Sequence, residues 1–168
     1  SCVRQLIQHS EATAIIARHL LGKRPSEGSN QNGNREKEDL AQSAFAKGFV
    51  HDIGKLVLIY NNPEQGAALY EDNWIEKGPD EINERDVERR AFGYDHTEAG
   101  AYAIDELGLP SALADVARNH HDTGAALTDD DDTWDLRAVR AANLVTKAME
   151  SSYSGLYAQE VSLDWEPC

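Results

Sequence analysis

The stretch FVHDIGKLVL, residues 49–58, decides the fold. It places two adjacent polar residues, His51 and Asp52, inside an otherwise apolar run that continues through Gly54 and Lys55. The apolar residues before and after the pair recur at helical spacing, so we expect a helix on either side of it. Polar groups are costly in an apolar core unless they have partners. The pair therefore predicts either a buried polar network or a site that performs chemistry.

Helical periodicity extends over most of the rest of the chain, and no stretch shows strand-like alternation. This pattern predicts an all-α fold. Asp95 and Glu98 have the spacing of a capping box, which marks the start of a helix. Helices are expected over 3–21, from 40 onward on both sides of the His-Asp pair, within 61–78, over 81–92, from 95 to 107, from 110 to 124 and from 134 to 149.

Two segments lack this periodicity. Residues 22–39 contain no large apolar side chain and are rich in Gly, Asn and Ser at their start, which predicts a flexible polar insertion. Residues 153–168 have no clear period. We therefore expect one helical domain over residues 1–152, interrupted by the insertion, and a C-terminal tail over 153–168.

Composition excludes some functions. The 168 residues carry a formal net charge of -14, whereas surfaces that bind nucleic acid or anionic membranes need clustered Lys and Arg. No apolar run approaches the roughly 18 residues that span a bilayer. The two cysteines, Cys2 and Cys168, form no metal or redox motif and suit a reducing cytosol. We expect a cytoplasmic protein whose native start lies upstream of Ser1.

Five of the six histidines predict a metal site. A helical bundle builds such a site from side chains on several helices, and imidazole and carboxylate are the usual ligands. Asp52 is suited to bridge two ions, and metal-bound water would then attack a phosphorus atom. In such an enzyme Lys55, one turn after His51, would face a phosphate oxygen. The expected metal ligands are His51, Asp52, His96, His120 and His121, with His9 close by.

The same residues carry a family resemblance. The chain resembles the HD superfamily of metal-dependent phosphohydrolases and, within it, the HDOD domain of bacterial signalling proteins. The matching stretches are QHS at 8–10, AFAKGFVHDIGKLVL at 44–58, ERRAFGYDHTEAGAYAIDELGLP at 88–110 and RNHH at 118–121. The resemblance implies an HD-like helical bundle. It also implies a further helical region before the QHS helix, which this sequence does not contain.

Three departures from related hydrolases concern the site. The enzymes of the HD-GYP group place a Glu four residues before the first histidine, where this chain has Gln5. HD enzymes place an Asp on the last helix, where the resemblance puts Asn143. The GYP signature expected after His120 and His121 is missing. Both substitutions replace a carboxylate with an amide, which brings no charge to neutralise a divalent ion.

These departures favour a regulatory output module over an efficient hydrolase. Such a module would act through signalling partners or fused domains, and a nucleotide ligand is an open alternative. The competing hypothesis is a metal-dependent phosphohydrolase for a nucleotide or cyclic nucleotide, with Asp52 and Lys55 as its catalytic residues. The expected cofactor is a divalent Mn, Fe, Mg or Zn ion. A polar core network that holds no ion is a third interpretation.

Overall fold

The computed structural model describes residues 2–23, 31–73, 84–122 and 131–157. All regular structure in these ranges is helical, which confirms the predicted all-α fold. The helices are α1 (Cys2–Gly22), α2 (Gln31–Val50), α3 (Ile53–Asn61), α4 (Pro63–Asn73), α5 (Glu84–Phe92), α6 (His96–Glu106), α7 (Ser111–Asn119) and α8 (Asp131–Tyr157).

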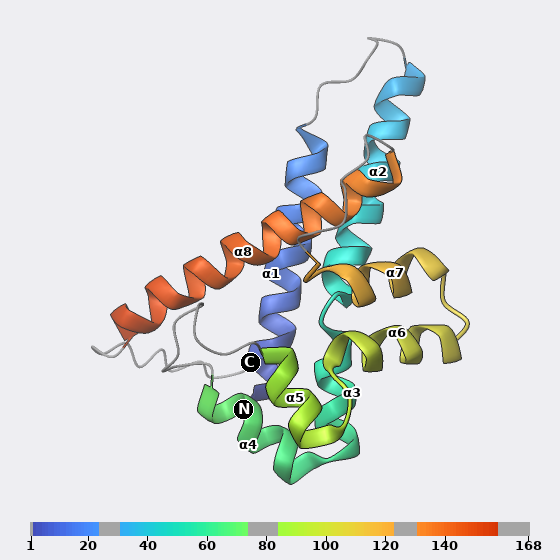
Figure 1. Ribbon diagram of the computed structural model, residues 1–168. Helices are drawn as coiled ribbons and strands as arrows, with labels where there is room; N and C mark the ends of the chain where they lie inside the picture. The colour runs from blue at the N-terminus through green and yellow to red at the C-terminus, as the bar shows by residue number, and fades with distance from the viewer. Residues whose placement is uncertain (1, 24–30, 74–83, 123–130, 158–168) are drawn as a thin grey trace, which may run out of the picture.

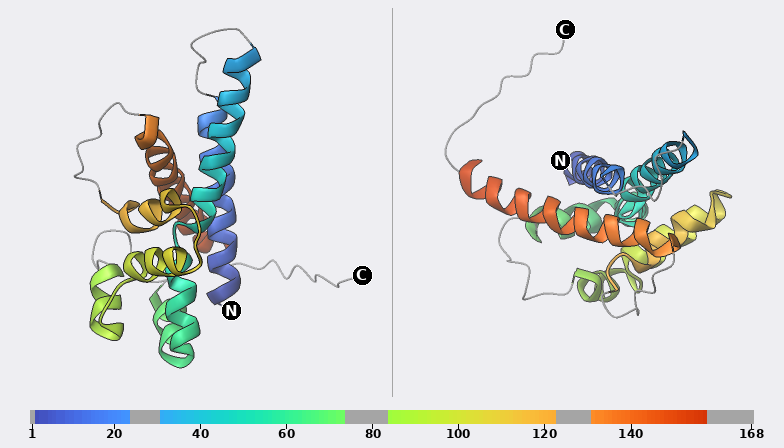
Figure 2. Two further views of the ribbon diagram at one scale, coloured as in Figure 1. Left: turned by 90° about the vertical axis from the view of Figure 1, so that its right-hand side faces the viewer. Right: turned by 90° about the horizontal axis from the view of Figure 1, so that it is seen from above.

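Two long helices and one crossing helix form the upper part of the molecule. Helices α1 and α2 run side by side in opposite directions, and α8 crosses both of them (Figures 1 and 2). The shorter helices α6 and α7 form a second antiparallel pair, which packs against α3 and α2. Three apolar clusters hold these helices together, and they are centred on Val139, Leu58 and Ile104, each fully buried.

Part of the segment predicted to be a flexible insertion is helical. Helix α2 begins at Gln31, so residues 31–39 are helical, whereas residues 24–30 lie outside the described ranges. The polar start of α2 is held against α1 by the Arg18–Glu38 ion pair at 3.0 Å, and Gln42 donates to Glu38 over 2.8 Å. Helix formation here depends on tertiary contact, which the composition of the segment does not report.

Two other helix ends differ from expectation. Helix α7 ends at Asn119, with His120 as its C-cap, so the His pair follows the helix and is not part of it. Gly124, where the sequence predicted the end, lies outside the described residues. Helix α8 continues to Tyr157, past the predicted domain boundary at residue 152. The rest of the predicted tail, 158–168, is also outside the described ranges.

The capping box at the start of α6 is present as predicted. The Asp95 carboxylate accepts from the backbone N–H of Thr97 at 2.9 Å and of Glu98 at 3.1 Å. In return, the Asp95 backbone N–H donates to the Glu98 carboxylate at 2.9 Å. These bonds satisfy N–H groups that a helix start leaves without partners. They fix where α6 begins, and so they fix the position of His96, its first residue.

Two glycines allow the helices that flank the His-Asp pair to approach their neighbours closely. A Cβ on Gly48 of α2 would lie 2.8 Å from the Ala14 Cα of α1. A Cβ on Gly54 of α3 would lie only 1.8 Å from the backbone oxygen of His96 in α6. The Gly that follows the His-Asp pair is therefore required by packing, because α3 touches the start of α6 at this point.

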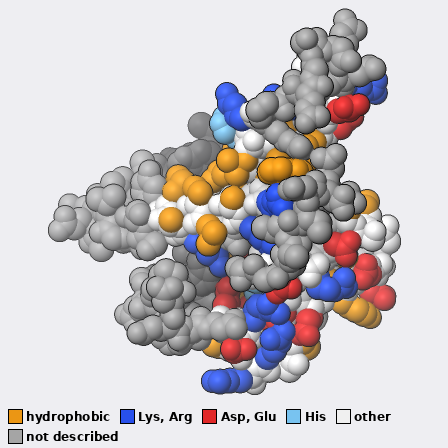
Figure 3. Space-filling model, turned by 45° about the horizontal axis from the view of Figure 1, so that its top comes forward, with side chains coloured by type: hydrophobic (Ala, Val, Ile, Leu, Met, Phe, Trp, Pro, Cys, Tyr) orange, Lys and Arg blue, Asp and Glu red, His pale blue; other side chains and the backbone are white. Residues whose placement is uncertain are grey.

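The surface of the described helices is of mixed character. Hydrophobic side chains gather beside Lys and Arg on the face shown in Figure 3. Leu144, Val145 and Met149 of α8 are among the exposed apolar residues. Within the described ranges, no helix combines the length and apolar character that a membrane span requires.

We predict that Gly54→Ala strongly destabilises the protein. The added methyl group would overlap the His96 carbonyl, and the backbone would have to move, at a cost of roughly 3 kcal/mol or more. Urea unfolding monitored by circular dichroism measures this cost. Gly22→Ala is the matched control, because a Cβ at that helical position meets nothing within 4 Å. Equal stability of the two variants would contradict the close approach of α3 and α6.

Candidate metal centre

The expected ligands meet at one buried place in the fold. They come from different helices, and each element delivers a single side chain or an adjacent pair. The contributing residues are His9 of α1, His51 and Asp52 between α2 and α3, His96 at the start of α6, and His120 and His121 after α7. All except His121 are almost fully buried, and His121 is partly exposed.

Backbone carbonyls orient two of the imidazoles. His51 Nδ1 lies 2.7 Å from the Gly48 oxygen, and His120 Nδ1 lies 2.9 Å from the Ala117 oxygen. A carbonyl oxygen can only accept a hydrogen bond, so Nδ1 carries the proton in both rings. The Nε2 atom of each neutral ring then presents a lone pair. Both Nε2 atoms are buried, and neither has a hydrogen-bond partner among the described residues.

These lone pairs point at a carboxylate. The Nε2 atoms of His120 and His96 lie 3.2 Å and 3.4 Å from Asp52 Oδ1. On the other side, His51 Nε2 lies 3.4 Å from Asp52 Oδ2. Acceptors that face one another in a dry interior repel unless a cation lies among them. These lone pairs are therefore placed as the ligands of a metal ion would be. A hydrogen bond at Nδ1 fixes each ring.

Two groups of possible ligands share Asp52. One consists of Asp52, His96, His120 and His121, and the other of His9, His51 and Asp52; the ligand atoms of each group lie within 4.8 Å of one another. The first group offers three imidazoles and a carboxylate, a donor set that suits Zn, Fe or Mn better than Mg. The buried His/Asp cluster can hold a metal ion.

The second group, made of His9, His51 and Asp52, offers fewer ligand atoms to a metal ion. His9 Nε2 lies 3.1 Å from the Asn143 Oδ1 atom, and an amide oxygen only accepts, so this nitrogen carries a proton. It then has no lone pair for a metal. The structure thus places Asn143 beside the cluster, as the resemblance implied. Gln5, the other amide in place of a carboxylate, is exposed on α1.

Lys55 lies inside the cluster and forms two ion pairs. Its Nζ atom is 2.9 Å from Asp52 Oδ2 and 2.8 Å from Glu84 Oε1, and the side chain is fully buried. Burial by itself favours the neutral amine, but the two carboxylates raise the pKa of Lys55 above its ordinary value. Burial likewise opposes the ionised form of Asp52, yet Lys55 and the nearby histidines keep the pKa of Asp52 well below its usual range.

Sequence reasoning missed the acidic residues around the cluster. Glu84 pairs with Lys55, and the fully buried Glu88 accepts from His96 Nδ1 at 2.6 Å. Both belong to α5, whose run of charged residues gives no sign of which ones face inward. Only tertiary packing determines which of these charged residues face the cluster.

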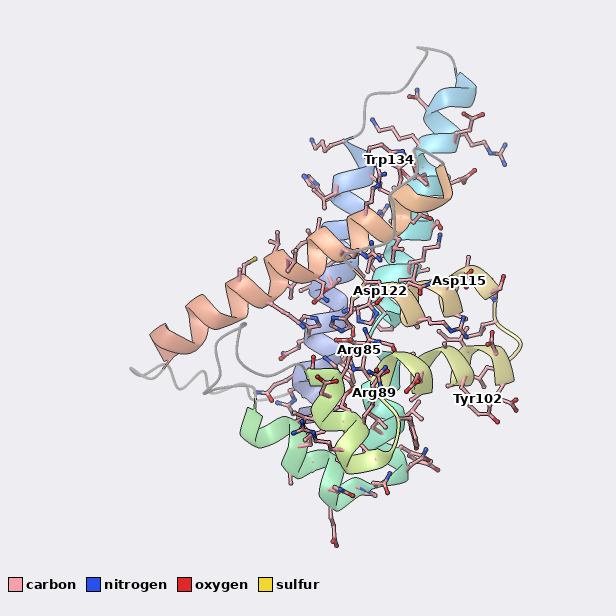
Figure 4. All side chains as sticks on the ribbon, in the orientation of Figure 1. Arg85, Arg89, Tyr102, Asp115, Asp122 and Trp134 are labelled. Carbon is pink, nitrogen blue, oxygen red and sulfur yellow. The ribbon has the colours of Figure 1, made fainter. Side chains whose placement is uncertain are left out.

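The arginines of α5 also contribute, and no sequence pattern indicates this. Arg85 and Arg89 lie near each other on α5 (Figure 4). Arg85 pairs with Asp95 at 2.8 Å and with Asp122 at 3.4 Å, and Arg89 pairs with Asp95 at 2.6 Å. These ion pairs join α5 to the residues next to His96 and His121. They connect the start of α6, which carries His96, with the segment after α7, which carries His121.

Three of the imidazoles, those of His51, His120 and His121, have a lowered pKa, which favours the neutral form that metal binding requires. Burial, opposed only in part by Asp52, lowers the pKa of His51 to about 3. Burial, together with the neighbouring His120 and His96, lowers the pKa of His121 to about 2. Burial also lowers the pKa of His120. A proton therefore competes poorly for these nitrogens at neutral pH.

Comparison with known families places this geometry in context. The HDOD domain family matches residues 1–123, which include every expected ligand. Helix α8 and Asn143 lie beyond the matched residues. No curated protein and no solved structure matches the chain.

We predict that the chelated protein loses stability as the pH falls below about 6.5, the ordinary pKa of histidine. Below that pH the unfolded chain takes up protons on His51, His120 and His121, whereas the folded protein does not. Each such histidine lowers the free energy of unfolding by about 1.4 kcal/mol per pH unit. Urea unfolding in EDTA at several pH values between neutral and mildly acidic measures the slope.

His19→Gln is the control for this slope, because it removes an exposed histidine from α1 and leaves the cluster intact. The same acid dependence is expected in that variant. A free energy of unfolding that stays constant over this pH range would contradict the neutral, buried state of the three imidazoles.

Proposed function

The chain belongs to the HDOD domain family, and from this membership we propose that it acts as a regulatory output module without efficient hydrolase activity. In this proposal the histidine cluster holds one divalent ion, which organises the domain. The domain then acts on signalling partners or on domains fused to it. Family membership supports the signalling role, and the enclosure of the cluster supports the lack of turnover.

The enclosure of Asp52 is the observation that carries this proposal. Asp52 is 2% exposed, His51 and His96 are 0% exposed, and only His121 reaches the surface in part. A phosphoester must bring its phosphorus atom within reach of metal-bound water to be hydrolysed. Two surface grooves are lined by residues of α1, α2 and α8, and none of the cluster residues lines either of them.

The charge of Lys55 supports the same proposal. A phosphate contact would need a lysine that can turn toward the substrate. Here Lys55 is buried between Asp52 and Glu84, and separating it from both would leave uncompensated carboxylates in the interior. We therefore assign Lys55 a structural role, in which it balances the charge of the cluster.

The alternative function, a metal-dependent phosphohydrolase for a nucleotide, rests on Asp52. Its two oxygens face two different groups of histidines, which is the arrangement that a carboxylate bridging two ions needs. The protonated His9 Nε2 and the amide of Asn143 weigh against the second ion. A nucleotide as a bound ligand without turnover is compatible with either function.

Metal content and turnover, measured on one protein sample, separate these functions. The protein is purified without chelator or nickel affinity resin, and its metals are quantified by mass spectrometry. We expect close to one Zn, Fe or Mn ion per chain, lost in Asp52→Ala and retained in His19→Gln. Hydrolysis of bis(p-nitrophenyl) phosphate is expected to stay at the background rate with the metal bound.

Each other outcome has a distinct meaning. Absence of metal from the parent protein, even after incubation with Zn²⁺ or Mn²⁺, would contradict the metal-holding part of the proposal. Turnover that requires the metal and disappears in Asp52→Ala would establish the phosphohydrolase instead.

We predict that Asn143→Asp raises metal affinity by roughly tenfold or more, because it adds a negative charge beside the cluster in a region of low dielectric. Its oxygen would replace the amide oxygen now 3.1 Å from His9 Nε2. Without metal, the same variant should be less stable than the parent, since the new carboxylate lies near Asp52. Competition with a chromophoric chelator and thermal unfolding in EDTA measure the two effects.

The control for this substitution is Gln5→Glu, which adds the same charge at an exposed position of α1. We expect its metal affinity to match that of the parent. An unchanged affinity in Asn143→Asp would contradict the position of residue 143 beside a cluster that binds metal.

A further inference from the structure

His96 lacks the kind of partner that orients the rings of His51 and His120. His51 and His120 donate their Nδ1 protons to backbone carbonyls three residues earlier in the chain. His96 is the first residue of α6, so no preceding helical turn offers it a carbonyl. Its backbone N–H is also one of those that a helix start leaves without an intrahelical acceptor.

Glu88 supplies both missing acceptors. Its Oε2 atom accepts from the His96 backbone N–H at 2.8 Å and from His96 Nδ1 at 2.6 Å. The carboxylate is fully buried and comes from α5, a different helix. The short bond to a carboxylate places the proton on Nδ1, so Nε2 is an acceptor. Without metal it accepts from His121 Nε2 at 2.9 Å.

Tyr70 fixes the carboxylate in turn. Its hydroxyl donates to Glu88 Oε1 at 2.7 Å, and the ring is 2% exposed. With three donors on its two oxygens, Glu88 is held from α4 on one side and from α6 on the other. A buried carboxylate this far from solvent is costly unless such bonds are complete.

We propose that Glu88, held by Tyr70, is the positioning residue that fixes the tautomer and orientation of His96 for metal binding. This inference rests on the proposed function as far as the metal is concerned. Glu88 is not one of the expected metal ligands; it acts through the His96 ring, to which it is hydrogen-bonded. A carboxylate behind a ligating histidine also makes the ring a better electron donor than a carbonyl does.

Metal affinity is the first test. Glu88→Gln keeps the shape of the side chain and one acceptor oxygen but removes the charge, so the fold is expected to survive. We expect Zn²⁺ or Mn²⁺ to bind roughly 10- to 100-fold more weakly to this variant. Tyr70→Phe, which removes one of three bonds to the carboxylate, should cause a smaller loss. Glu106→Gln, an exposed change on α6, is the control with unchanged affinity.

The tautomer of His96 is the second test, and it needs no metal. Long-range ¹H–¹⁵N correlation spectra of the chelated parent should show His96 with its proton on Nδ1. In Glu88→Ala the ring should shift toward the other tautomer or a mixture. A proton on Nε2 of His96 in the parent would overturn the proposal even if no variant folds.

The metal affinity and the His96 tautomer together distinguish failure of the proposed metal binding from failure of the proposed role of Glu88. A parent protein that binds no metal but carries the proton on Nδ1 would refute the proposed metal binding while upholding the role of Glu88. A parent that binds metal with an affinity unaffected by Glu88→Gln, and with the His96 tautomer unaffected by Glu88→Ala, would overturn the role of Glu88 alone.

Discussion

The convergence of acceptors on Asp52 is the constraint on which the rest of the structure depends. Imidazole lone pairs from three helical segments face the two oxygens of one buried carboxylate. Such an arrangement repels itself in a medium of low dielectric unless positive charge is present. Lys55 supplies part of that charge from within the chain, at 2.9 Å from Asp52. A divalent ion among the remaining lone pairs would supply the rest.

The helices are arranged so that this cluster forms at all. Gly48 and Gly54 bring α2 against α1 and α3 against α6, and between them the chain leaves the helix at His51 and Asp52. The capping box at Asp95 sets the start of α6, and ion pairs from α5 hold it there. The rings of His51, His120 and His96 are held by hydrogen bonds at Nδ1, on the side of each ring that faces away from Asp52. Local helix signals therefore position the ligands, and contacts between helices orient them.

Enclosure and charge together distinguish a structural metal site from a catalytic one. A hydrolase must expose its metal to a phosphoester and must supply enough anionic ligands to hold the ion through turnover. In this chain the cluster is buried, one carboxylate serves both groups of histidines, and an amide stands at Asn143. A metal bound in this way would couple several helices.

The sequence by itself determined the helical fold, the helices on either side of His51 and Asp52, the cap at Asp95 and the histidines that meet in the core. These features follow from residue type and short-range spacing, which act within one or two helical turns. Tertiary structure alone decided that residues 31–39 are helical, that Gln5 is exposed, and that Lys55 is paired with Glu84. It also decided that Glu88, one acid among several on α5, supports His96. Contacts of this kind join residues from different helices, and the periodicity of any one helix contains no information about them.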